Sequence, residues 1–225
     1  MTNDIEFFSQ YCERTANTGF AEPINTLSNI AFIVAGILAW KILSQLKTDQ
    51  HKSIFDITLL FFSIFLIGLG SALWHTIAKP WAELVDVIPI LFFISIFILS
   101  FLYRIVRMNI LMVILFFLVF QLVNTGVILY APKQALNGSL FYAPTALMFV
   151  IFAGFLAKQS SKHRGLFYTA LGIFSIAIVF RTVDQQACQY FPIGTHFIWH
   201  ILVATVLYLV FRFLALSLGG RHQRR

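Results

Sequence analysis

Seven stretches of this sequence are long and apolar enough to cross a lipid bilayer as helices. A transmembrane helix needs about 20 mostly apolar residues, and runs close to this length occur at residues 26–43, 55–75, 84–103, 110–130, 140–157, 166–180 and 196–216. Each run is continuously apolar, whereas the strands of a membrane β-barrel alternate between polar and apolar residues. Only 11% of the 225 residues are charged, compared with about 25% in soluble domains. We therefore expect an all-α integral membrane protein, a bundle of seven transmembrane helices.

Short polar segments remain around this bundle. We expect residues 1–25 to form an extracytoplasmic N-terminal segment, residues 26–216 the transmembrane domain, and residues 217–225 a basic cytoplasmic tail. The first segment does not resemble a secretory signal, because it carries Asp4 and Glu6 where a signal carries positive charge.

The orientation of the bundle follows from the distribution of Lys and Arg. Twelve of these 16 residues lie on the side shared by the first, third and fifth connectors and the C-terminal end. Because basic residues gather in cytoplasmic loops, this bias predicts an N-terminus outside and a C-terminus in the cytoplasm. The net charge of +7 then reflects membrane topology, and we do not expect nucleic acid as a partner.

Three of the six histidines fall at the outer ends of two predicted helices. His196 and His200 are four residues apart and so share one face of the last helix, while His75 ends the second helix. Three neutral histidines with an open fourth position are typical of a catalytic zinc site. We therefore predict a zinc site near the extracytoplasmic face. For each histidine alone, the alternative is an interfacial side chain that faces the lipid headgroups.

Two further polar residues are expected at the same depth. Ser71 lies four residues before His75 and shares its helix face, and Asp86 follows His75 by 11 residues, near the outer start of the third helix. An ionisable residue inside a membrane is costly and therefore indicates a function. The alternative for Asp86 is an interfacial position in which it pairs with Lys79.

Together these motifs resemble those of the alkaline ceramidases and of the wider superfamily of seven-helix membrane hydrolases that includes the adiponectin and progestin receptors. The N-terminal region is similar to the ceramidases rather than to the receptors, with Tyr11-Cys12-Glu13, then Glu22, Asn25-Thr26 and Ser28-Asn29. The resemblance extends from about residue 10 to residue 200. It implies a zinc-dependent hydrolase that cleaves the N-acyl bond of ceramide or a related membrane lipid amide, giving a fatty acid and an amine.

This resemblance implies a role for each polar residue of the site. Asp86 would act as the general base toward a water activated by zinc, and Ser71 would donate a hydrogen bond to the developing oxyanion. Two other classes of protein stay open on the sequence alone. One is a receptor or sensor with a structural metal site, and the other is a proton-coupled transporter that uses Asp86 and the histidines as a relay.

The two cysteines, Cys12 and Cys188, are both predicted on the non-cytoplasmic side, where a disulfide can persist. A chain with two cysteines forms one bridge or none. The resemblance to the ceramidases implies that these two are bridged.

The resemblance also implies a calcium site in the N-terminal segment. Its ligands would be the carboxylates of Glu13 and Glu22 and the carbonyl oxygen of Tyr11. Gln10 and Thr15 depart from the ceramidase pattern, which has an Asp and an Asn near these positions. Because calcium takes six to eight oxygens with several carboxylates, this departure predicts weak calcium binding or none.

Overall fold

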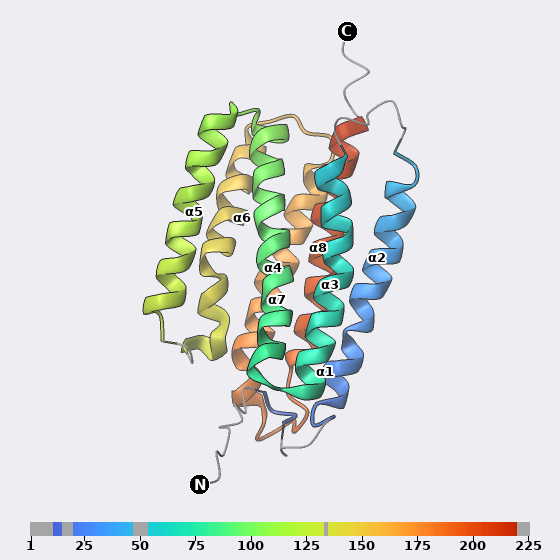
Figure 1. The fold of residues 1–225 in the computed structure, drawn as a ribbon, viewed down its shortest axis with the longest axis vertical. Coiled ribbons are helices and arrows are strands. Elements are labelled where there is room, and N and C mark those ends of the chain that lie inside the picture. Colours follow the sequence, from blue (N-terminus) through green and yellow to red (C-terminus); the bar gives the residue numbers. More distant parts are fainter. Residues whose placement is uncertain (1–10, 15–19, 47–53, 133–134, 220–225) are drawn as a thin grey trace.

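The computed structural model describes residues 11–14, 20–46, 54–132 and 135–219. Seven helical spans in this part of the chain are long and apolar enough to cross a membrane, which confirms the predicted number. They run side by side as a single bundle (Figure 1). The elements are α1 (Pro23–Ser28), α2 (Ile30–Leu43), α3 (Phe55–Ile77), α4 (Pro80–Ser100), the π-helix η2 (Phe101–Val106), α5 (Ile110–Tyr130), the 3-10 segment η3 (Ala135–Tyr142), α6 (Ala143–Ala157), α7 (Arg164–Ala187) and α8 (His196–Gly219). Gln10, Thr15 and residues 220–225 of the predicted tail lie outside the described residues.

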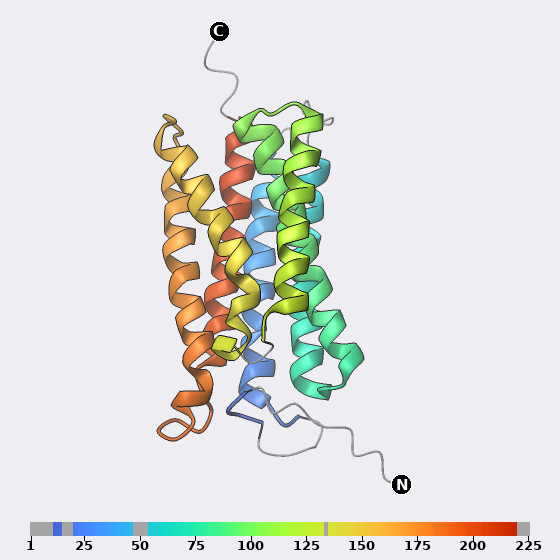
Figure 2. The ribbon, with the colours of Figure 1, turned by 90° about the vertical axis from the view of Figure 1, so that its left-hand side faces the viewer.

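The helices α3 and α8 form the centre of the bundle and are its most buried spans. Helix α2 packs against both, α4 packs along α3, and α7 packs along α8. Helix α5 is the least buried span; it lies at the left-hand edge of the bundle in Figure 1 and in front of the other helices in Figure 2. Its apolar surface is therefore suited to contact lipid rather than protein.

The sixth span is longer than its apolar run. The sequence predicts a helix over residues 166–180, but α7 continues for two more turns to Ala187. Arg181 interrupts the apolar run, and Asp184 follows it one turn later. Both side chains point into the protein, where Asp184 is completely buried and Arg181 lines a cavity. Because these polar groups have partners inside the bundle, they do not end the helix.

The backbones of α3 and α4 approach closely near the ends of these helices that the short connector joins. A Cβ atom at Gly70 would collide with the carbonyl group of Val85 and would lie 3.2 Å from the Cα atom of Asp86. Small residues permit this kind of contact between membrane helices. As a result, Asp86 on α4 lies opposite Ser71 on α3.

Candidate metal centre and active site

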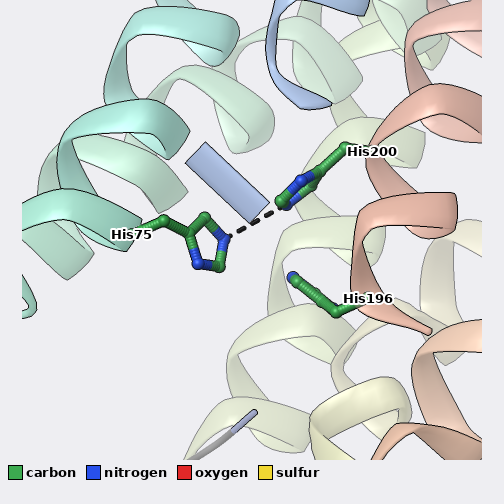
Figure 3. Close-up of side chains that lie close together, drawn as sticks. All are labelled: His75, His196 and His200. Atoms are coloured by element: carbon green, nitrogen blue, oxygen red, sulfur yellow. Dashed lines mark hydrogen bonds between the residues drawn. The ribbon is translucent and has the colours of Figure 1, made fainter. Parts of the chain in front are cut away.

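Three buried histidines converge between α3 and α8. His75 lies in the last turn of α3, whereas His196 and His200 lie in the first two turns of α8. Figure 3 shows the His75 ring pointing across the gap toward the two rings from α8. Each histidine offers one nitrogen to a common point, and these three atoms lie within 4.8 Å of one another. The predicted cluster is therefore assembled in the structure.

The hydrogen bonds on the far side of two rings determine which nitrogen is free. The Nδ1 atom of His75 donates to the carboxylate of Glu22. The Nδ1 atom of His200 lies 2.7 Å from the hydroxyl oxygen of Ser28. The hydroxyl group of Ser28 donates its hydrogen to the backbone carbonyl oxygen of Asn25. Ser28 must therefore accept from His200. Both rings thus carry their proton on Nδ1 and present a bare Nε2 atom to the centre.

The two bare Nε2 atoms are 3.1 Å apart. Two lone pairs at this distance cannot form a hydrogen bond with each other, so the arrangement is suited to a cation between them. Two tetrahedral zinc ligands, each about 2.0 Å from the metal, would be about 3.3 Å apart. The donor set of three neutral imidazoles therefore fits zinc.

His196 is held by different contacts. Its ring stacks on the ring of Tyr11 with centroids 3.9 Å apart, and its backbone N–H donates to the carboxylate of Asp184 at 2.9 Å. Asp184 also accepts from the backbone N–H groups of Thr195 at 2.6 Å and of Cys12 at 3.1 Å. It thus caps the start of α8 and fixes the first turn that carries His196. Asp184 is not among the residues predicted from the sequence, although a carboxylate beyond an apolar run was a signal for it.

Ser71 and Asp86 face the same centre. The hydroxyl of Ser71 is 3.4 Å from the Nε2 atom of His200, and it also contacts the carboxylate of Asp86. Both residues line one cavity together with His196 and His200. Asp86 is therefore directed toward the histidines. In the described part of the chain it forms no ion pair with Lys79.

Beyond this polar end, the cavity is lined mainly by apolar side chains. They come from α4, α6, α7 and α8 and include Phe93, Phe97, Phe149, Phe174 and Leu207. Along α8 the lining extends from His196 to Val210. At 1.5 Å per residue, this distance is about 21 Å. The cavity thus has a polar end at the histidines and an apolar part along α8, which is called the apolar channel below.

The residues predicted to bind calcium are occupied by protein donors. One carboxylate oxygen of Glu13 accepts from the backbone N–H of Ile24 and the other from that of Asn25, at 2.6 and 2.8 Å. The carbonyl oxygen of Tyr11 accepts from the backbone N–H of Arg14.

Glu22 already has cationic and polar partners. One of its oxygens pairs with the guanidinium of Arg14, and the other accepts from His75 and from the side chain of Asn25. Burial alone would raise the pKa of Glu22, but the hydrogen bond from His75 and the positive charge of Arg14 outweigh it and lower that pKa. The donor set does not fit calcium, because a buried guanidinium supplies the positive charge at this carboxylate. This role of Arg14 is not among the predictions made from the sequence.

A disulfide joins Cys12 to Cys188, with Cα atoms 5.3 Å apart. It links the segment that carries Tyr11 to the C-terminal end of α7. The same segment places the buried hydroxyl of Tyr11 in the cavity, where burial raises its pKa to about 12.

The fold and the site define a class of protein: a seven-helix bundle with the character of a membrane protein and a buried three-histidine centre that could hold a metal. The family model described as Ceramidase matches residues 9–224, nearly the whole chain, and the protein therefore belongs to the ceramidase family. Membership of this family implies hydrolysis of lipid amides. A comparison with curated proteins found no match.

Proposed function

We propose that the protein is a zinc-dependent membrane amidase that cleaves the N-acyl bond of ceramide or a related lipid amide. The observation that carries this proposal is the pair of bare Nε2 atoms of His75 and His200, beside which Ser71 and Asp86 line the same cavity. A sensor with a structural metal would not need a serine and a carboxylate at this position.

The neutral imidazoles of His75, His196 and His200 would hold zinc, which would make water acidic enough to act as a nucleophile near neutral pH. The side chain of Asp86 accepts the proton that the attacking water loses and returns it to the nitrogen of the leaving amine. Ser71 donates its hydroxyl hydrogen to the amide oxygen as negative charge develops there. The products are a fatty acid and an amine.

The apolar channel supports a lipid as the substrate. A fatty acyl chain placed along α8 would bury its methylene groups against phenylalanine and leucine side chains, which favours binding by about 0.8 kcal/mol for each buried methylene group. The same channel holds the scissile amide at the polar end and limits the access of bulk water. We infer that the amide enters from the membrane with its acyl chain in this channel.

The first prediction tests the metal and the reaction together. Wild-type protein purified in detergent should contain about one zinc per chain and should release fatty acid from ceramide, as measured by elemental analysis and mass spectrometry of the lipids. His196→Ala should lose both, because two imidazoles bind zinc weakly. His163→Ala is the matched control, since His163 lies outside the cluster at the start of α7. Zinc without hydrolysis in the wild type, against a panel of lipid amides, would favour the sensor.

A further inference from the structure

One cationic side chain lines the cavity beside the carboxylates of Asp86 and Glu83, and it has no part in the mechanism above. Arg181 enters from α7, and its guanidinium carbon lies 5.3 Å from the ring centroid of Trp199, 5.4 Å from that of Tyr142 and 5.9 Å from that of Tyr11. Three aromatic rings thus surround the cation. Such rings attract a cation and limit where its side chain can move, so the guanidinium has a defined position.

No carboxylate neutralises this guanidinium in the described part of the chain. The ion pairs found there are Arg14–Glu22 and Arg104–Asp56, while the neutral ring of His75 donates a hydrogen bond to Glu22. The buried Nε atom of Arg181 has no hydrogen-bond partner. The hydroxyl of Tyr11 lies beside Arg181 but carries no charge. Asp86 acts on Arg181 only through its charge, from beyond ion-pair distance. A buried cation with an unused donor is costly unless an anion completes its surroundings.

The position of Arg181 relates this unused donor to the reacting centre. The ring of Tyr11 stacks on His196 and also contacts the guanidinium. Trp199 lies directly before His200 on α8 and is the nearest ring to Arg181. The cation therefore sits about one aromatic ring away from the three histidines, at the polar end of the cavity and not along the apolar channel.

We propose that Arg181 binds a carboxylate of the lipid ligand. The guanidinium fork matches a carboxylate in geometry and charge, and an amide at the histidines would bring a carboxylate a few bonds away within its reach. This carboxylate has two sources. It belongs either to an acidic headgroup, as in an N-acyl amino acid, or to the fatty acid that hydrolysis releases. The proposal rests on the proposed function for the position of the amide.

A binding measurement tests the proposal without any need for hydrolysis. Titration of the purified protein with palmitate and with methyl palmitate, followed by the fluorescence of Trp74 and Trp199 in the cavity wall, gives the affinity for a charged and a neutral form of one chain. The wild type should bind palmitate more tightly than the ester. Arg181→Gln should lower the affinity for palmitate by about 10- to 100-fold, which is the usual contribution of a hydrogen bond to a charged group. The affinity for methyl palmitate should not change.

Two controls separate this effect from a loss of fold. Arg164→Gln removes an exposed arginine at the other end of α7 and should change neither affinity. Arg181→Lys keeps the charge but loses the fork, so its palmitate affinity should fall between those of the wild type and Arg181→Gln. If palmitate affinity is unchanged in both Arg181 variants, the proposal is overturned.

The two sources of the carboxylate are distinguished by hydrolysis of N-palmitoylglycine and N-palmitoylethanolamine. If the headgroup binds Arg181, the wild type should prefer the glycine conjugate in kcat/KM and Arg181→Gln should lose that preference. If the product binds Arg181, the ratio of the two kcat/KM values should be the same in the wild type and in Arg181→Gln. Added palmitate should then inhibit the wild type more strongly than the variant. Should neither substrate be cleaved, the proposed function fails while the palmitate titration still decides the role of Arg181.

Discussion

The carboxylate of Glu22 joins the N-terminal segment to the metal centre. It pairs with Arg14 on one side and accepts from the Nδ1 atom of His75 on the other. Arg14 also donates to the backbone carbonyl oxygen of His75 at 3.3 Å. His75 is thus held at both its ring and its backbone by residues outside α3. Such outer partners commonly set the orientation of a metal-binding imidazole.

We expect the guanidinium of Arg14 to supply the positive charge that calcium would otherwise bring to this segment. Wild-type protein should show the same melting temperature and the same hydrolysis with a calcium chelator as with millimolar calcium, because the carboxylates are already satisfied. Arg14→Gln should unfold at lower temperature, since breaking a buried ion pair costs about 3–5 kcal/mol. Thermal unfolding in detergent measures both effects. Calcium that stabilises the wild type by several degrees would contradict this interpretation.

Asp86 and Ser71 should differ in their effect on the reaction. Asp86→Asn keeps the shape of the side chain but removes the base, so hydrolysis should fall by about 100- to 10,000-fold. Ser71→Ala removes one donor to the oxyanion and should cost about 100-fold. Both variants should keep their zinc, which elemental analysis would check beside the rate.

The metal content separates two explanations for a loss of activity. If Asp86→Asn also lost zinc, Asp86 would support the metal and its role as a base would remain unproven. Wild-type rates in both variants would place the reaction elsewhere in the protein.

At the scale of the elements, the site depends on how closely α3 and α4 pack. The backbone contact at Gly70 sets the position of Asp86 relative to Ser71, because Val85 and Asp86 lie directly against it. This contact is made by the backbones of the two helices and not by the side chains of Ser71 and Asp86. The position of the proposed base, Asp86, is therefore determined by the packing of α3 against α4.

Gly70→Ala should separate these two helices. Its added methyl group would meet the carbonyl of Val85, and overpacking of this kind typically costs about 1–3 kcal/mol. Hydrolysis should fall with it, whereas zinc should stay because none of the three histidines lies on α4. Gly126→Ala on α5 is the control, since its methyl group would meet nothing within 4 Å. Equal melting temperatures and rates for the two variants would refute this account.

The helices were predictable because the apolar runs are long and uninterrupted, and the three histidines were predictable because their spacing places them at the ends of two spans. The end of α7 was not predictable from the sequence, because Arg181 and Asp184 resemble loop residues until their buried partners are known. The role of Arg14 was also hidden, since its contact with Glu22 depends on how the N-terminal segment folds back onto α3. The hydrophobic pattern of a sequence predicts where helices lie, but it does not predict contacts between a connector and a helix.

At the scale of the whole molecule, the disulfide and the metal centre lie at the same end of the bundle. Cys12 is bridged to Cys188, and its backbone N–H donates to Asp184, which caps the helix carrying His196 and His200. Disulfides persist in oxidising compartments and not in the cytosol. The bridge therefore agrees with the distribution of basic residues, and we propose that the site lies near the extracytoplasmic face.

The last prediction tests this orientation with single cysteines. Tyr130 ends α5 at the end of the bundle where α1 begins, and Gln159 follows α6 at the opposite end (Figure 1). Both are exposed, and neither native cysteine is free. A membrane-impermeant maleimide should label Tyr130→Cys in intact cells but reach Gln159→Cys only after the cells are permeabilised. The reverse pattern would place the metal centre on the cytoplasmic side, where the Cys12–Cys188 bridge would be exposed to cellular reductants.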